Sequence, residues 1–337
     1  MKTILNEKGE PIVLNAREAR VSDILQRKVN ALGYEISIST LTTIMKKITE
    51  QKFFELPPAD YLPLRVGEGA WSSNLVTYRS FMTADGFETG VINTGSNNGR
   101  LAQGDAAVDS VPIKVLNWAK SIGWSLFDLE LAAKSGNWDL VTAKEKSRKK
   151  NWDLGIQQVA FIGLAGDSSV KGLLNQTGVT NNLTEITTPI SQMTTAQLKT
   201  FCATILGVYR ANVNRTAWPT HFVIPESDYL GMAAPTNADF PLKSVLAVLE
   251  ETFQIMTKNK GFKILPCAYG DNAVGGLGVQ RYALYNADEE SIRMDVPVDY
   301  TSTLANSIDN FSFQNVGYGQ FTGVGLYRPA ELMYFSF

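Results

Sequence analysis

Histidine and cysteine are scarce in this sequence. The 337 residues contain one histidine, His221, and two cysteines, Cys202 and Cys267. An ordinary structural zinc site takes four ligands drawn mainly from these two residue types, so three scattered ones exclude it. Two cysteines in so long a chain also make no disulfide framework. Both stand among apolar neighbours, which predicts buried free thiols in a protein made in a reducing cytoplasm.

Long apolar runs and an excess of positive charge are absent too. No stretch of 18 apolar residues occurs, so no membrane span is expected, and the first fifteen residues lack the apolar core of a signal peptide. The formal net charge is -2, whereas proteins that neutralise nucleic-acid phosphates are clearly basic. These absences predict no membrane partner and at most weak, non-specific contact with DNA.

A catalytic or cofactor-binding motif is also missing. His221 stands in a strand-like apolar segment, 220–224, where a lone histidine is usually part of the core. The glycine-rich segment 163–172 lacks the order of a phosphate-binding loop, because Lys171 stands before Gly172 instead of after it. We therefore predict no enzyme, no cofactor and no metal site.

Two charged clusters each leave two interpretations open. The acidic residues 288–290 are either a solvated hairpin tip or the holders of a cation. The basic run 144–150 is either a solvated helix face, with Glu145 and Lys149 paired, or a contact with DNA or with a neighbour's acidic surface. The solvated interpretation is favoured for both clusters.

The first third of the chain has an extended character. Two stretches near helical spacing, 16–32 and 38–48, precede Pro57 and Pro58, which force an extended path. Residues 67–110 alternate short β-prone runs with polar turns that contain glycine, which predicts a long hairpin. Neither an arm nor a long hairpin buries its own apolar face, so both indicate burial against other copies of the chain.

The remaining sequence predicts a mixture of helices and strands, hence an α+β fold. A strand over 111–124 precedes a helix over 126–135, and Asn137 is the expected N-cap of a long helix that ends near residue 162, with Asp139 in its first turn. Further helices are expected at 196–212, 226–233 and 243–257, and further strands at 220–224, 262–268, 280–286 and within 311–337. With no catalytic site, this pattern indicates a homo-oligomeric structural protein.

Five short motifs follow one another in a specific order. They are 118–125 (WAKSIGWS), 129–136 (LELAAKSG), 159–163 (VAFIG), 171–175 (KGLLN) and 323–329 (GVGLYRP). Their order and spacing resemble those of major capsid proteins of tailed bacteriophages of the Hong Kong 97 (HK97-like) type, especially the branch of encapsulin-like coat proteins. The resemblance is best over roughly 60–180 and 310–337.

That resemblance implies an architecture. The HK97-like capsid fold has an N-terminal arm, an extended β-hairpin loop, a peripheral domain with a long spine helix, and an axial domain. In this chain these parts would be residues 1–66 (arm), 67–110 (extended loop), 111–194 and 291–337 (peripheral domain, with the spine helix at about 138–162) and 195–290 (axial domain).

The resemblance also implies a function. The chain would self-assemble into pentamers and hexamers of an icosahedral phage head that encloses double-stranded DNA, a virion component made and assembled in the bacterial host cytoplasm. Its partner is the chain itself, with portal, scaffold and decoration proteins as further candidates. The alternative is the shell of an encapsulin nanocompartment that stores a cargo enzyme. The residues expected at contacts between copies are Phe53, Phe54, Tyr78, Phe81, Met82, Phe87 and Arg100.

Two features depart from some members of that type. No lysine stands between Arg65 and Lys114, so covalent crosslinking through a lysine of the extended loop is not expected. The sixty or so residues before the hairpin leave no room for a large cleaved scaffolding segment. Guidance of the shell would then fall to a separate scaffold protein or to none.

Overall fold

The computed structural model describes residues 2–5, 11–14, 51–82, 106–134, 139–233 and 243–337. The chain divides into two compact units, Met1–Lys52 with Ala132–Trp138 and Phe53–Leu131 with Asp139–Phe337. In the first unit, β1 (Lys2–Leu5) pairs antiparallel with β2 (Pro11–Leu14). The helices predicted at 16–32 and 38–48 lie outside the described residues. The other three described sheets belong to the second unit.

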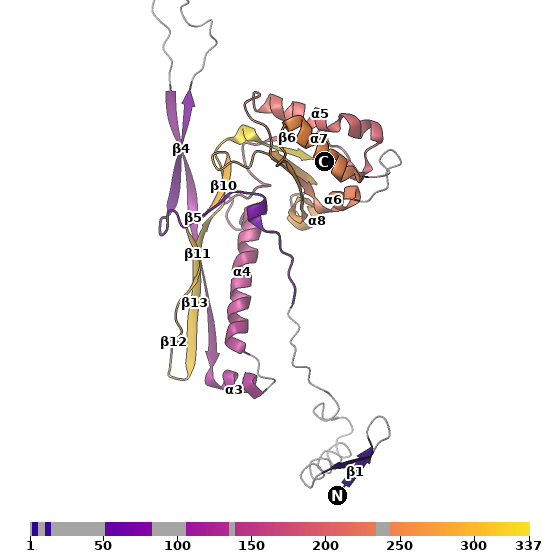
Figure 1. Cartoon of the computed structure of the whole chain (residues 1–337). Helices are drawn as coiled ribbons and strands as arrows, with labels where there is room; N and C mark the ends of the chain where they lie inside the picture. Colours follow the sequence, from indigo (N-terminus) through magenta and orange to yellow (C-terminus); the bar gives the residue numbers. More distant parts are fainter. Residues whose placement is uncertain (1, 6–10, 15–50, 83–105, 135–138, 234–242) are drawn as a thin grey trace, which may run out of the picture. The chain divides into compact units, whose positions relative to one another are not determined.

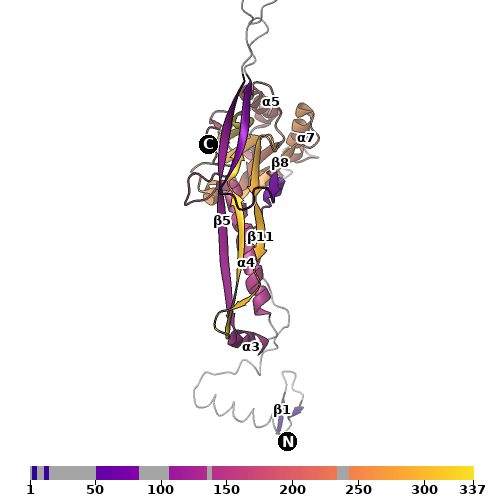
Figure 2. The same cartoon turned by 90° about the vertical axis from the view of Figure 1, so that its left-hand side faces the viewer.

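The longest strands build one sheet in the order β11–β13–β5–β4 (Figure 1). Its members are β4 (Asn74–Met82), β5 (Ala106–Ser125), β11 (Val298–Ser302) and β13 (Ser312–Thr322), and β12 (Asn306–Ser307) pairs with β13. The second half of β5 pairs with β13 and its first half with β4, both antiparallel. We call the two-stranded part, Asn74–Met82 with 106–114, the ribbon; Figure 2 shows it continuing beyond β13.

Helix α4 (Leu140–Ile162) packs on this sheet and follows α3 (Leu126–Lys134), so both predicted helices are confirmed. The side chain of Asp139 accepts a hydrogen bond from the backbone N–H of Thr142 at 3.0 Å and is the N-cap. The predictions that Asn137 is the N-cap and that Asp139 lies inside the first turn were both wrong. A carboxylate serves well as N-cap because it also faces the positive end of the helix dipole.

Two glycines of β13 allow α4 to approach the sheet closely. A Cβ atom at Gly317 would lie 2.6 Å from Nε of Arg148, and one at Gly319 would lie 2.5 Å from the ring of Trp152. Arg148 and Trp152 stand one helical turn apart and are both buried. The side chains of Arg148 and Trp152 therefore occupy the space beside Gly317 and Gly319, and this fit holds the helix close to the sheet.

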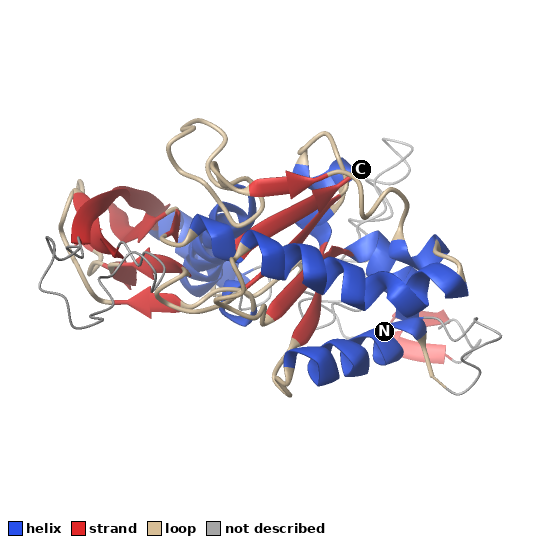
Figure 3. Cartoon of the chain, turned by 90° about the horizontal axis from the view of Figure 1, so that it is seen from above, coloured by secondary structure: helices blue, strands red, loops and turns tan. Residues whose placement is uncertain are grey.

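A second sheet has the order β6–β15–β9–β7–β8. Its strands are β6 (Thr180–Asn182), β7 (His221–Pro225), β8 (Lys263–Cys267), β9 (Arg281–Tyr285) and β15 (Leu332–Ser336). Figure 3 shows helices against it; the helices of this part are α5 (Thr195–Asn212), α6 (Glu226–Ala233) and α7 (Val245–Thr257). The apolar C-terminal segment is thus a sheet strand, as predicted.

This sheet is apolar on both faces. Phe222 and Tyr282 lie in one core cluster, whereas their strand neighbours Val223 and Ala283 lie in a second one. Successive residues of a strand point to opposite faces, so a sheet with a core on each side needs nearly continuous apolar strands. That requirement explains why 220–224 and 280–286 read as strands from sequence.

The third sheet of the second unit is small and has three strands. It has the order β14–β10–β3, formed by β3 (Leu64–Val66), β10 (Ile292–Val296) and β14 (Val324–Leu326). β3 pairs parallel with β10, and β14 pairs antiparallel with it. The remaining short helices are η1 (Pro58–Asp60), η3 (Ile190–Gln192), η4 (Ala268–Gly270), α8 (Asn272–Gly275) and η5 (Pro329–Glu331).

Candidate assembly surfaces

One face of the ribbon carries large apolar side chains in the open. Tyr78 is 72% exposed, Val108 68% and Val76 50%. Their strand neighbours Leu75 and Thr77 are partly buried, because that face turns toward the rest of the subunit. An apolar face of this kind on a two-stranded ribbon is the usual mark of a protein interaction site.

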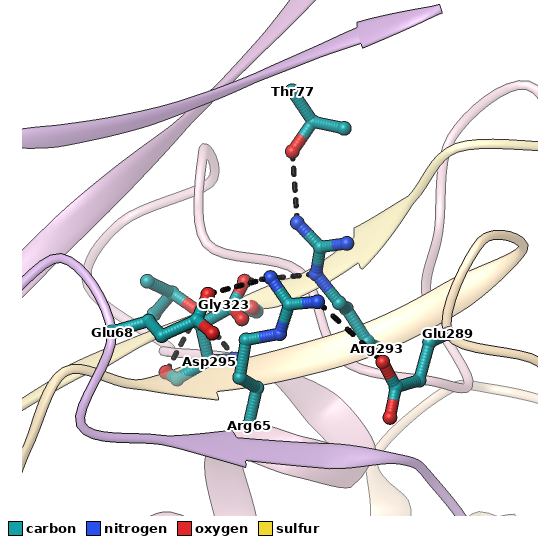
Figure 4. A network of polar contacts seen from close by, with 8 residues as sticks. Arg65, Glu68, Thr77, Glu289, Arg293, Asp295 and Gly323 are labelled. Carbon is teal, nitrogen blue, oxygen red and sulfur yellow. Dashed lines mark hydrogen bonds and ion pairs between the residues drawn. The ribbon is translucent and has the colours of Figure 1, made fainter.

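A polar network fixes the base of the ribbon to the small sheet (Figure 4). Arg293 of β10 donates a hydrogen bond to Oγ1 of Thr77 at 2.9 Å and lies 3.4 Å from the buried carboxylate of Asp295. Arg65, at β3, donates to Glu68 at 2.8 Å and lies 3.5 Å from Glu289. Because Arg293 and Asp295 are both largely buried, this ion pair holds a defined geometry.

The acidic cluster 288–290 is paired with arginines. Arg328 lies 2.5 Å from a carboxylate oxygen of Glu290 and 3.8 Å from one of Asp288. Arg65 takes Glu289. Within the described part of the chain, no group of three or more metal-ligating side chains occurs. All three acidic side chains remain exposed, so the cluster is a solvated turn, as favoured from the sequence, and its acids form ion pairs with arginines at the surface.

The predicted arm residues Phe53 and Phe54 lie in an extended segment beside α4. They are 46% and 48% exposed, and the ring of Phe54 meets Tyr269 edge to face at 6.3 Å. The segment is fastened by the backbone N–H of Leu56, which donates to Oε1 of Gln157 at 2.7 Å, and by an ion pair between Glu55 and Lys150. Both phenylalanines thus present about half of their surface to the exterior of the subunit.

The predicted loop residues are only partly described. Tyr78 lies on the exposed face of the ribbon. Phe81 and Met82 are the last two residues of β4, and the positions of their side chains are not described. Phe87 and Arg100 lie outside the described residues.

Sequence reasoning missed a second exposed apolar surface. It is formed by α3 and by the connection between β11 and β13, and the rings of Phe127 and Phe311 touch edge to face there at 4.9 Å. A short helix and two loops carry no periodic pattern, so nothing in the sequence singled them out. The exposed members are Leu126, Phe127, Leu131, Leu304, Ile308 and Phe311.

The basic run on α4 is not one solvated face. Arg148 is 1% exposed and donates to the Tyr300 hydroxyl at 2.8 Å and to Oδ1 of Asn315 at 2.7 Å. Glu145, expected to pair with Lys149, accepts a hydrogen bond from Nδ2 of Asn315 at 2.8 Å. One turn of the basic run therefore belongs to the joint between helix and sheet, because Gly317 leaves room there for a guanidinium.

Of the scarce reactive side chains, the two cysteines are core residues and the histidine is partly buried. His221 lies on β7 with its ring stacked on Tyr285 and Nδ1 2.9 Å from Oγ1 of Thr220. Burial, with a smaller effect of Lys263, lowers the pKa of His221 to about 4, so the ring is neutral at pH 7. Cys202 and Cys267 are buried free thiols, and burial raises the pKa of each to about 12. The prediction of buried free thiols is confirmed, whereas His221 is only partly buried and lies at the edge of the core.

No helix in the described ranges combines the length and the apolar character that crossing a membrane requires.

The major capsid protein family matches residues 92–336 of the chain. No curated protein matches it. Among solved structures, the capsid of Myoviridae phage XM1 superposes with a TM-score of 0.72 at 17% identity, covering 90% of this chain and 99% of that one. The capsid of a native GTA particle gives 0.56 at 13% identity, covering 91% and 98%. Mycobacterium phage Ogopogo gives 0.54 at 10% identity, covering 90% and 99%.

These likenesses establish the fold, and the family match establishes the class of protein. The predicted HK97-like capsid fold is confirmed, and the nanocompartment alternative is not favoured. The family and its structural neighbours are structural proteins, in agreement with an exposed apolar ribbon. The chain belongs to the major capsid protein family, the structural coat proteins of tailed phages.

Proposed function

We propose that copies of this chain assemble into the pentamers and hexamers of an icosahedral phage head that encloses double-stranded DNA. The observation that carries the proposal is the exposed face of the ribbon, with Val76, Tyr78 and Val108. Each of these side chains removes apolar surface from water on contact with a second copy, which stabilises the pair by about 1.5–3 kcal/mol per fully buried side chain. Summed over all copies in a shell, such contacts hold the shell together without covalent crosslinks.

The proposal assigns a part to each segment. Residues 1–66 serve as the arm, 67–110 as the extended loop, 111–194 with 291–337 as the peripheral domain and 195–290 as the axial domain. The contact residues are those expected from the sequence, Phe53, Phe54, Tyr78, Phe81, Met82, Phe87 and Arg100. Support comes from the exposure of Phe53, Phe54 and Tyr78.

The proposed surroundings follow from the same role. The chain is placed in the capsid of the virion after assembly in the bacterial host cytoplasm, and it has no catalytic role. Portal, scaffold and decoration proteins are its proposed further partners. The net charge of -2 supports only weak, non-specific contact with the enclosed DNA.

The test replaces the exposed ribbon face. A variant with Val76→Ser, Tyr78→Ser and Val108→Ser should keep the thermal midpoint of the unassembled subunit within about 4 °C of the wild type, because exposed side chains contribute little to folding. The same variant should lose particles in electron micrographs. Particles formed at wild-type yield by the triple variant would contradict the proposal.

A further inference from the structure

The ribbon has two strand edges that differ in their hydrogen-bonding capacity. Within the described residues, β4 is the last strand of its sheet, and β13 pairs with β5 only from Val115 onward. Both long edges of the ribbon therefore lack a neighbouring strand in the described subunit. An open strand edge is a template for pairing with another chain unless something blocks it.

One hydrogen bond fixes which backbone groups point outward. Val115 donates its N–H to the carbonyl of Ser73 at 3.0 Å, in the same register in which Asn74 pairs with Lys114 and Val76 with Pro112. Hydrogen-bonded and non-hydrogen-bonded pairs alternate along an antiparallel ladder. The backbone groups of Val76, Tyr78 and Ser80 therefore point away from β5, and those of Pro112 and Ser110 point away from β4.

The edge of β5 is blocked. Pro112 has no N–H to offer, and the N–H of Ser110 is already donated to Oδ1 of Asp109 at 2.8 Å. Asp109 is held in turn by Arg79 of β4, whose Nη2 lies 2.8 Å from Oδ2. Two successive outward donors of β5 are thus removed, and the carboxylate that removes one of them is fixed in place.

The edge of β4 carries no such block. The residues whose backbone points outward, Val76, Tyr78 and Ser80, are not proline, and none of the residues 74–80 is lysine, which natural edges often use as protection. The strand is nine residues long. A guest strand on this edge would run beside the exposed side chains of Val76 and Tyr78 and cover part of their apolar surface.

The first unit of the chain contains a small sheet with open edges. Within the described residues, β1 and β2 pair only with each other, over four residues each, and a two-stranded sheet by itself is at best marginally stable in water. β2 opens with Pro11, paired with Leu5, whereas β1 contains no proline. The edge of β1 is therefore the one that is free to extend the sheet.

We propose that β1 of one copy pairs with the open edge of β4 in a second copy, giving a four-stranded sheet β2–β1–β4–β5 made from two molecules. The inference rests on the proposed assembly, because it needs two copies side by side. It names the backbone edge that joins them and leaves the edge of β5 unused. Main-chain hydrogen bonds supply the attachment, and the exposed face of the ribbon supplies the apolar contact.

The test is disulfide trapping between two differently tagged copies in assembled particles. One copy carries a cysteine at one of two successive positions of β1, Thr3→Cys or Ile4→Cys, and the other carries Val76→Cys, Tyr78→Cys or Ser80→Cys. Directly paired residues in adjacent strands lie within reach of a disulfide. After mild oxidation, denaturing non-reducing electrophoresis should show a mixed dimer for one β1 position with one or two β4 positions.

The matched control is Ser110→Cys. It lies opposite Tyr78 on the same exposed ribbon but one strand further from the guest, so the mixed dimer should fall by about tenfold or more. The wild-type chain should give no mixed dimer, because Cys202 and Cys267 are buried.

Each other outcome overturns the inference. A mixed dimer through Ser110→Cys would mean that β5 provides the edge, and a Tyr78→Cys homodimer in its place would mean that a second β4 occupies it. Particles that give no mixed dimer at all would mean that β1 lies elsewhere. Absence of particles from the wild type, both alone and with co-expressed scaffold proteins, would contradict the proposed function instead.

Discussion

At the scale of single residues, a buried arginine holds the long helix on its sheet. The guanidinium of Arg148 meets neutral oxygens, those of the Tyr300 hydroxyl, the Asn315 side chain and the Asn315 backbone. The side chain of Asn315 also donates a hydrogen bond to Glu145. The negative charge of Glu145 therefore lies close to the positive charge of Arg148, with Asn315 between them. A buried charge arranged in this way depends on every hydrogen bond around it.

Replacing this arginine should therefore be costly. Arg148→Met keeps an unbranched side chain but leaves Oδ1 of the buried Asn315 without its donor, and we expect a loss of about 2–4 kcal/mol in the free energy of unfolding. Lys149→Met, the next residue and exposed, should change it by no more than about 0.5 kcal/mol. Urea denaturation of the unassembled subunit measures both. Equal effects of the two variants would show that Arg148 is not part of the joint.

The single histidine gives the subunit a pH dependence. The pKa of His221 is about 4 in the folded chain and 6.5 for the free side chain, so the unfolded chain binds the proton first as the pH falls. Stability from this group is complete above pH 6.5 and is lost progressively between about 6.5 and 4. After allowance for solvent screening at a partly exposed ring, we expect a loss of about 1–2 kcal/mol.

The histidine contribution is separable from that of the carboxylates. His221→Asn keeps a polar atom near Thr220 and removes the titration, so its free energy of unfolding should fall less than that of the wild type between pH 7 and pH 4.5. Denaturant unfolding at the two pH values gives the difference. Parallel losses in wild type and variant would show that His221 titrates normally in the folded chain.

The burial of single residues was easier to predict from the sequence than the contacts between the long helix and its sheet. A lone histidine and two cysteines within apolar segments are placed by their neighbours along the chain, and all three proved to be at least half-buried. Arg148 is different, because six charged residues stand within 144–150 and nothing local marks which one turns inward. Gly317 decides it, and that glycine lies far along the chain on β13.

At the scale of elements, the fit of α4 on β13 depends on glycine. Gly319→Ala puts a Cβ atom 2.5 Å from the buried Trp152 ring, and overpacking of this kind should cost about 1–3 kcal/mol in the free energy of unfolding. Gly155→Ala, on the exposed side of the same helix with no heavy atom near the new Cβ, should gain about 0.5–1 kcal/mol. Thermal or urea unfolding distinguishes the two. Stabilisation by both alanines would refute the close approach.

The elements themselves followed from the sequence wherever a periodic pattern was present. The helices and strands predicted between 195 and 286 begin and end within about two residues of their predicted limits, because caps and apolar strands define them locally, whereas the short η4 and α8 were not predicted. β5 was predicted to begin at 111 and begins at Ala106, since its first five residues (AAVDS) carry no alternating apolar pattern and are defined only by pairing with β4. Pairing between distant strands has no local signal, so the sharing of β5 between the ribbon and a sheet was not predictable.

At the scale of the whole molecule, we propose that copies of this chain build a closed shell. The family match and the fold place it among coat proteins, and its exposed apolar surfaces lie on the ribbon and around α3. A single subunit leaves the apolar side chains of both surfaces exposed to water, and contact with other copies would bury them.

Electron microscopy of the purified chain, with sedimentation velocity beside it, tests that claim most directly. We expect closed round particles or capsomer rings, produced by the chain alone or together with a co-expressed scaffold protein. A monomer at every concentration and salt condition, with and without candidate scaffold proteins, would contradict it.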